Sequence, residues 1–266
     1  VNALIMKYNN QQIGALQKKL RKKILELSFN KNTGHIACSL SCIDILISIL
    51  ILYKKKDDFI LSKGHSALAL YVVLNYLNEI SDSMLESFYN NGTKLPAHPA
   101  PNLIDSIPFA TGSLGHGLPL ATGMALANKI NKKNKKVIVL MSDGETNGGT
   151  LWEASHFAVS NELNNLIVII DNNKLQGFGR TKEVIGDTAE INKLRKIGYE
   201  TYSCCGHNPK QILKVFKKIE RSKSKLPKII IADTIKGKGV KFMEDKMEWH
   251  YLPLNEELFN IAKEEL

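Results

Sequence analysis

The chain has 266 residues, of which 44% are hydrophobic and 23% are charged. This length and composition are typical of a folded globular protein and exclude the disordered and fibrous classes. The formal net charge of +10 allows nucleic acid, a membrane surface or a phosphorylated small molecule as a binding partner.

Helical periodicity in the apolar residues begins near the N-terminus, at 11–29. The same spacing predicts eight further helices, at 41–53, 66–77, 81–90, 114–130, 150–161, 187–197, 208–222 and 255–265. Basic clusters at 18–23 and 132–136 lie on or beside these helices without interleaved aromatic residues. Nucleic-acid platforms usually carry such aromatics, so we expect solvated lysines and neither a nucleic-acid nor a membrane partner.

Short, nearly continuous apolar runs between the helices predict five strands, at 58–62, 136–142, 166–171, 199–203 and 228–234. Strands without polar alternation are buried on both faces, which indicates a parallel sheet covered by helices. Strand and helix alternate from residue 58 onward. We therefore predict an α/β fold with a doubly wound, mainly parallel sheet, helices on both faces, and one domain over 1–266 with an N-terminal helical lead-in.

The cysteines and the apolar segments bear on the compartment. Cys38 and Cys42 are four residues apart and Cys204 and Cys205 are adjacent, which is neither zinc nor redox spacing, so we expect buried, reduced thiols. The longest apolar run, 43–53, has eleven residues, fewer than the roughly 20 that a membrane span needs. The first twenty residues lack a continuous apolar signal segment. We expect a cytoplasmic protein.

Polar residues follow two of the predicted strands at their carboxyl ends, where parallel sheets bind ligands. Asp143 follows one strand, and Asn173 follows the next strand 30 residues later. A crossover between neighbouring parallel strands takes about 30 residues, so we expect both side chains above adjacent strands. Asp-Gly after a strand is by itself a common turn, but the paired spacing favours a shared ligand.

A carboxylate, an amide oxygen, a backbone carbonyl and phosphate oxygens together make an all-oxygen set suited to Mg²⁺ or Ca²⁺. Gly144 lets the backbone approach an anionic ligand closely. The helix expected to begin near Thr150 adds N–H groups nearby. The sequence therefore predicts a divalent metal bound together with a phosphorylated ligand.

The stretch Asp143-Gly144-Glu145, followed at this distance by 171–177 with the sequence Asp-Asn-Asn-Lys-Leu-Gln-Gly, resembles the thiamine diphosphate motif of transketolases. The resemblance is strongest to their separately encoded N-terminal subunits. Other similar stretches occur in family order, namely Thr33-Gly34-His35-Ile36, Leu61-Ser62-Lys63-Gly64-His65, Ala97-His98-Pro99, 111–117, Trp152-Glu153-Ala154, 236–240 and Trp249-His250. The resemblance implies a thiamine diphosphate-binding fold in which the chain forms the diphosphate-binding domain.

The resemblance also implies residue roles around the diphosphate. Asp143, Asn173 and the carbonyl of Leu175 would ligate Mg²⁺ or Ca²⁺. Gly144 would donate its N–H to the diphosphate, and Glu145 belongs to the same cofactor-binding motif.

Further roles concern the middle of the cofactor. His65 and His250 would reach diphosphate oxygens or nearby substrate groups. Gly112, Ser113 and Leu114 would pass under the cofactor, with the carbonyl of Gly112 near the pyrimidine amino group and Leu114 supporting the bent ring pair.

Histidines would also contact the sugar. The resemblance makes His35, His98 and His250 the catalytic residues, and His35 and His98 would move protons as the sugar carbonyl becomes an alkoxide, which suits a near-neutral pKa. His116, where many relatives carry glutamine, is interpreted as a pocket-wall residue. We expect His156 and His207 to have structural roles.

The implied reaction transfers a two-carbon glycolaldehyde unit from a ketose to an aldose, with thiamine diphosphate carrying the chemistry. Full-length transketolases continue into a pyrimidine-binding domain and a C-terminal domain. The resemblance therefore implies that the partner is a separately encoded C-terminal subunit, in an α2β2 heterotetramer. Gly148 stands where relatives usually carry a glutamate of the dimer interface, which puts dimer strength or communication between active sites in doubt.

Three alternatives remain open. The alpha subunit of a 2-oxo acid dehydrogenase shares the metal motif, but the motifs at His35 and His65 argue against it. Deoxyxylulose-phosphate synthase shares the chemistry, but 61–65 and the compact region 66–110 are closer to transketolase. A non-catalytic assembly subunit would not need the intact pair Asp143 and Asn173.

Overall fold

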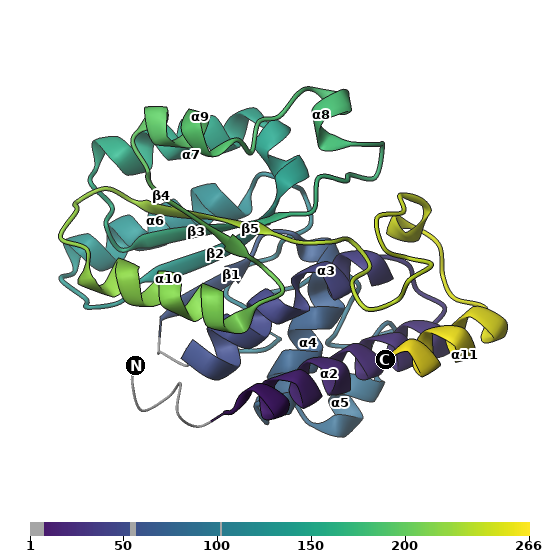
Figure 1. The fold of residues 1–266 in the computed structure, drawn as a ribbon. Coiled ribbons are helices and arrows are strands. Elements are labelled where there is room, and N and C mark those ends of the chain that lie inside the picture. Colours follow the sequence, from purple (N-terminus) through teal and green to yellow (C-terminus); the bar gives the residue numbers. More distant parts are fainter. Residues whose placement is uncertain (1–7, 54–56, 102) are drawn as a thin grey trace.

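The fold is built on a five-stranded sheet with strand order β1-β2-β3-β5-β4, flanked by helices on both faces (Figure 1). A computed structural model describes residues 8–53, 57–101 and 103–266. All neighbouring strands pair in parallel, which confirms the predicted fold class. The strands are β1 Asp58–Leu61, β2 Val137–Ser142, β3 Leu166–Asn172, β4 Glu200–Cys205 and β5 Lys228–Asp233.

Alternate residues of the central strands enter two separate hydrophobic cores. In β2, Ile138 and Leu140 face one core, whereas Val137, Val139 and Met141 face the other. Because side chains alternate across a strand, a strand buried on both faces must be apolar at every position. This explains why the runs that predicted strands carry no polar alternation.

The helices lie close to the predicted segments. Predicted helix 81–90 is shorter than expected, since α5 ends at Glu86, and the four-residue helix α8 was not anticipated. The helices are α2 Asn10–Asn30, α3 Ile36–Leu46, α4 Ala67–Tyr76, α5 Asp82–Glu86, α6 Gly117–Ile130, α7 Gly149–Ser160, α8 Thr181–Val184, α9 Ile191–Ile197, α10 Pro209–Arg221 and α11 Glu256–Glu265.

Helix α3 begins earlier than predicted and continues into a π-helical segment, Ile47–Tyr53. Together they form the one helix in the described part of the chain that is long and apolar enough to cross a membrane, with 18 residues and a mean hydropathy of 2.3. The expectation that no apolar segment is long enough to span a membrane was therefore wrong by length and composition. However, 94% of this segment is buried inside the protein, as befits a core helix, which is apolar all round.

The cysteines only partly follow the prediction. All four are free thiols, and Cys38 and Cys42 are buried in α3. Cys205, in contrast, is exposed, because it ends β4 at the edge of the sheet. The expectation of four buried thiols is therefore corrected.

The sheet register determines where the predicted metal ligands lie. Strands β2 and β3 are neighbours, with Ser142 paired to Asp171. Asp143 and Asn173 therefore follow adjacent strands at the same edge of the sheet, as the 30-residue spacing predicted.

Candidate functional site

A cavity of about 260 Å³ lies at the carboxyl ends of β2 and β3. Ten of the twelve predicted site residues line it, namely His35, His65, His98, Gly112, Leu114, Asp143, Gly144, Asn173, Leu175 and His250. The fold thus brings segments from both halves of the sequence to one place. Ser113 and Glu145 are the two predicted residues that do not line it.

Three imidazole rings surround that of His35. Its ring centroid lies 5.2 Å from that of His250, 5.6 Å from that of His65 and 6.0 Å from that of His98. The backbone of His35 is left-handed, with φ of 60°, and its N–H donates to the carbonyl of His250 at 3.1 Å. Such backbone geometry is uncommon outside glycine and concentrates at functional sites.

These histidines have lowered pKa values. Burial, followed by the positive charge of neighbours such as His98 and Lys236, lowers the pKa of His35 to about 4. Burial and Lys236 lower the pKa of His250 to about 3, and burial lowers the pKa of both His65 and His98. The expectation of near-neutral pKa values is therefore corrected: the imidazoles are neutral at pH 7 because the cavity disfavours further positive charge.

Two buried lysines in the cavity wall were not assigned roles from the sequence. Lys63 is paired with the buried carboxylate of Asp171. Lys236 donates to the carbonyl of Leu175 at 3.0 Å and contacts Nδ1 of His250 at 2.7 Å. Both lysines stand in stretches that resemble the family, which was the available signal, but lysine is usually solvated and only the fold reveals the burial.

The surroundings of Asp143 suit a cation. Its carboxylate accepts hydrogen bonds from the N–H of Gly144 and from Oγ1 of Thr181, both at 2.9 Å. Burial and the neighbouring charge of Asp171 raise the pKa of Asp143 above its usual value. A buried carboxylate with only neutral hydrogen-bond donors would be stabilised by a divalent ion.

The other two predicted metal ligands stand beside Asp143 in the cavity wall. Oδ1 of Asn173 accepts from the N–H of Leu175 at 3.1 Å, and its Nδ2 donates to Ser41 at 3.1 Å. The carbonyl of Leu175 accepts from Lys236. Within the described residues, no three His, Cys, Asp or Glu side chains are grouped to hold a metal. An ion here would therefore need amide, backbone and phosphate oxygens, the set that the sequence predicted.

Two glycines of the cavity wall leave little room for a side chain. Gly112 has φ of 140°, and a Cβ there would lie 2.7 Å from the ring of His98. A Cβ on Gly144 would lie 3.1 Å from the side chain of Gln176. At both positions a side chain would crowd the cavity wall.

Glu145 anchors the site from outside the cavity. Its buried carboxylate accepts from Oγ of Ser62 at 2.5 Å, from the N–H of Gly115 at 3.0 Å and from the N–H of Ser142 at 2.8 Å. These bonds tie the segment 112–115, which contains Gly112 and Gly115, to the end of β2. Glu145, which the sequence predicted to bind the cofactor, does not line the cavity and instead supports its wall through these bonds.

Ser113 and His116 also lie off the cavity. His116 is exposed and its Nδ1 lies 3.0 Å from the carbonyl of Ser113. The interpretation of His116 as a pocket-wall residue is therefore wrong. Both residues belong to the segment that leads into α6, of which His116 is the N-cap.

Gly148, where relatives usually carry a glutamate, has room for a side chain. Gly148 is the N-cap of α7. A Cβ there would lie 3.4 Å from the carbonyl of Glu145, an ordinary van der Waals distance. The local structure would thus accommodate a glutamate, so glycine is not required by packing within this chain.

Comparison with known proteins places this geometry in a family. Residues 51–266 match the family described as "Transketolase, thiamine diphosphate binding domain". The chain is 34% identical over 261 residues to one subunit of the apulose-4-phosphate transketolase of Actinobacillus succinogenes, covering 94% of each protein. It is 34% identical over 257 residues to 6-deoxy-6-sulfo-D-fructose transketolase subunit SqwG of a Clostridium species, covering 93% of each.

A solved structure agrees with these matches. The transketolase of Campylobacter jejuni superposes with a TM-score of 0.86 at 28% identity, over 97% of this chain and 43% of that protein. The chain thus corresponds to less than half of a one-chain transketolase and to nearly all of the two separately encoded subunits. It belongs to the transketolase family of transferases, as the thiamine diphosphate-binding part that some members encode separately.

Proposed function

We propose that this chain is the diphosphate-binding subunit of a split transketolase and transfers two-carbon ketol units from a ketose to an aldose together with a separate C-terminal subunit. The observation that carries the proposal is the cavity in which Asp143, Asn173 and four histidines meet. The separately encoded relatives, which match this chain along nearly their whole length, support the division into two subunits.

The proposed cofactor arrangement follows from the oxygen atoms at the sheet edge. Asp143 and Asn173, with the carbonyl of Leu175, would hold Mg²⁺ or Ca²⁺ together with oxygens of the diphosphate. The ammonium group of Lys236 neutralises further negative charge. When bound, thiamine diphosphate supplies the nucleophilic carbon for cleaving a carbon–carbon bond next to a carbonyl.

The histidines would perform the proton chemistry of the substrate. His35 and His98 are neutral at pH 7 because their pKa values are lowered, so each ring offers one donor and one acceptor nitrogen. They can hydrogen-bond sugar hydroxyls and accept a proton as the ketose is cleaved. His250, held by Lys236 at 2.7 Å, sits where substrate and diphosphate would meet.

Exposed apolar residues at the cavity support a partner that covers it. Leu114, Phe178 and Tyr251 line the cavity, and 48%, 83% and 55% of their surfaces respectively are exposed. Apolar groups of this size beside a polar site mark contact surfaces. We propose that the C-terminal subunit covers this side in an α2β2 heterotetramer.

Reconstitution tests the proposed function. The chain would be mixed with a C-terminal transketolase subunit, thiamine diphosphate and Mg²⁺, and assayed with ketose donors and aldose acceptors. Because relatives are named for apulose 4-phosphate and 6-deoxy-6-sulfo-D-fructose, sugar phosphates and sulfosugars are the first donors to test. We expect ketol transfer only when both subunits are present.

Two results would contradict the proposal. Transfer by this chain alone at an ordinary enzymatic rate would rule out the divided active site. Release of carbon dioxide from a 2-oxo acid, without ketol transfer, would instead identify a 2-oxo acid dehydrogenase subunit. The Asp143→Ala variant is the matched control, since it should abolish transfer while leaving the sheet intact.

A further inference from the structure

A buried polar cluster outside the cavity is centred on Asp44 of α3. Its Oδ1 accepts from Nε2 of Gln17 at 2.8 Å and from a guanidinium nitrogen of Arg21 at 2.9 Å. Its Oδ2 accepts from the second terminal nitrogen of Arg21 and from Nδ1 of His207 at 2.8 Å. Burial opposes the charge of Asp44, but His207 and Arg21 outweigh burial and hold its pKa below the usual value. The carboxylate is therefore charged and fully hydrogen-bonded.

The contacts of His207 define its tautomer. Nδ1 faces the charged carboxylate of Asp44 and must carry a proton. Nε2 accepts the backbone N–H of Ile235 at 2.8 Å and must carry a lone pair. The ring is thus a neutral bridge with one donor and one acceptor, and it joins the Asp44 cluster to the backbone that follows β5. Both ring nitrogens are used, which is a stronger constraint than packing alone.

The bridged backbone is the segment that carries Lys236 into the cavity. On one side of Lys236, the N–H of Ile235 is held by His207. On the other side, the N–H of Gly237 donates to the carbonyl of Ala37 at 3.0 Å, and the carbonyl of Lys238 accepts from Nε of Arg21 at 3.1 Å. Two of these three ties thus lead to the Asp44 cluster. Within the described residues, the hydrogen bonds of the Lys236 ammonium include no carboxylate. The backbone carbonyl of Lys236 also accepts from the N–H of Asp245 at 2.9 Å, so the ties on both sides act together with this bond to place the lysine.

We propose that His207 is a positioning residue for Lys236. It does not line the cavity, and it acts through the N–H of Ile235 to fix the lysine against Leu175 and His250. This inference rests on the proposed function for the role of Lys236 in binding the diphosphate. The geometric part, that the position of Lys236 depends on His207, does not rest on the proposed function.

Two substitutions separate the halves of the bridge. In His207→Gln, the glutamine side chain is long enough to place its amide oxygen near the position of Nε2. This oxygen can still accept from the backbone N–H of Ile235. His207→Asn is shorter and can still donate to Asp44 from near the position of Nδ1, but it cannot reach Ile235. If His207 served only the Asp44 cluster, the asparagine variant would be the better substitute. The proposal predicts the reverse.

The first measurement needs no ligand. The purified chain is labelled with limiting acetic anhydride, and the acetylation of Lys236 is quantified by mass spectrometry relative to the exposed Lys18. We expect several-fold faster labelling of Lys236 in His207→Asn and a rate like the wild type in His207→Gln. Equal labelling of Lys236 in all three proteins, or faster labelling in His207→Gln than in His207→Asn, would overturn the proposal.

The second measurement is calorimetric titration with inorganic pyrophosphate and Mg²⁺. We expect roughly 10-fold weaker binding in His207→Asn, the scale of lost supporting contacts, and near-wild-type binding in His207→Gln. In a Lys236→Met background, His207→Asn should weaken binding no further. A full additional loss in that background would overturn the proposal. Lack of pyrophosphate binding by the wild type, with labelling as expected, would contradict the proposed function and leave the positioning role standing.

Discussion

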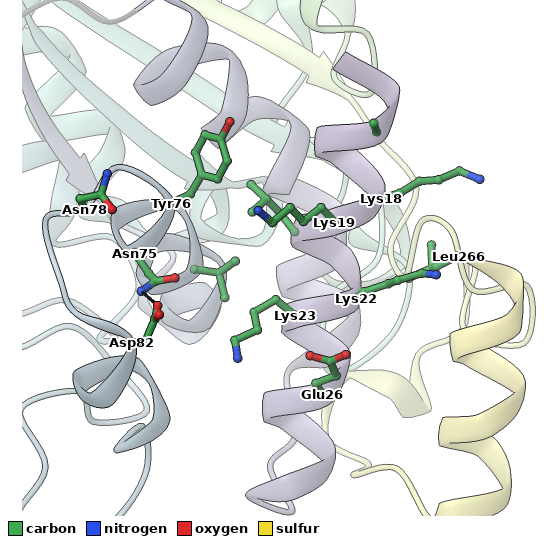
Figure 2. A pocket seen from close by; sticks show the side chains of 13 residues that line it. Lys18, Lys19, Lys22, Lys23, Glu26, Asn75, Tyr76, Asn78, Asp82 and Leu266 are labelled. Carbon is green, nitrogen blue, oxygen red and sulfur yellow. Dashed lines mark hydrogen bonds between the residues drawn. The ribbon is translucent and has the colours of Figure 1, made fainter. Parts of the chain in front are cut away.

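Two cation-rich cavities of the described residues differ in size, and the larger of the two is not the candidate site. A cavity of about 870 Å³ lies along α2 and beside α4, lined by Lys18, Lys19, Lys22 and Lys23 among others. Figure 2 shows these lysines projecting from α2, with Tyr76, Asn75 and Asp82 on the opposite side. The cavity at the carboxyl ends of β2 and β3 measures only about 260 Å³.

The two cavities differ in how their charges are held. In the larger one, Lys23 pairs with Glu86 at 2.6 Å, but their side chains are 33% and 51% exposed. In the smaller one, the paired side chains of Lys63 and Asp171 are 1% and 0% exposed. Solvated charges interact weakly, whereas buried charges must be positioned by the fold and perturb their neighbours. Burial of charge therefore marks the site better than cavity volume does.

Breaking the buried pair should have the largest effect on stability. Lys63→Met leaves the carboxylate of Asp171 buried without its cation, although Ser41 still donates to it at 2.9 Å. We expect the free energy of unfolding to fall by about 3–5 kcal/mol, measured by urea denaturation. The double variant Lys63→Met/Asp171→Asn should recover part of this loss. A decrease below about 1 kcal/mol, typical of an exposed pair, would remove the distinction between the two cavities.

Acid should destabilise the folded protein through the histidines of the smaller cavity. The pKa of His35 falls from its ordinary value of 6.5 to about 4 in the folded protein. Between these values the unfolded chain binds more protons, so the stability present above pH 6.5 is lost as the pH falls towards 4. Melting temperatures from about pH 7 to about pH 4.5 should fall more steeply in the wild type than in His35→Gln. Parallel curves for the two proteins would show that His35 titrates normally.

A substitution in the larger cavity should have the smallest effect on stability and on ketol transfer. Lys23→Ala removes an exposed ion pair with Glu86, so the free energy of unfolding should change by less than about 0.5 kcal/mol. Ketol transfer by the reconstituted enzyme should be unchanged. A marked loss of transfer would give the α2 cavity a part in the reaction.

The elements and the sheet edge could be predicted from the sequence because their signals are local. Continuous apolar runs identified the five strands, and the spacing of Asp143 and Asn173 placed them above neighbouring strands. Helix α3 was predicted too late in the chain, because residues 36–42 are buried on every side and lack a helical stripe.

The charge state of the site could not be predicted in the same way. Lys63 and Lys236 look like ordinary surface lysines until the fold buries them. The lowered pKa of His35 arises from burial and from charges distant in sequence, including Lys236. Likewise, Glu145 bonds to Ser62 and to Gly115 across long sequence separations, which no local motif reveals.

Calorimetric titration of thiamine diphosphate tests the central claim, that the smaller cavity binds the cofactor through Asp143. Titrations would use the reconstituted subunits with Mg²⁺ or with EDTA, and would compare the wild type, Asp143→Asn and the triple variant Lys18→Ala/Lys22→Ala/Lys23→Ala. We predict metal-dependent binding that weakens about 100-fold or more in Asp143→Asn and changes little in the triple variant. Undiminished binding by Asp143→Asn, or its loss in the triple variant, would contradict the account.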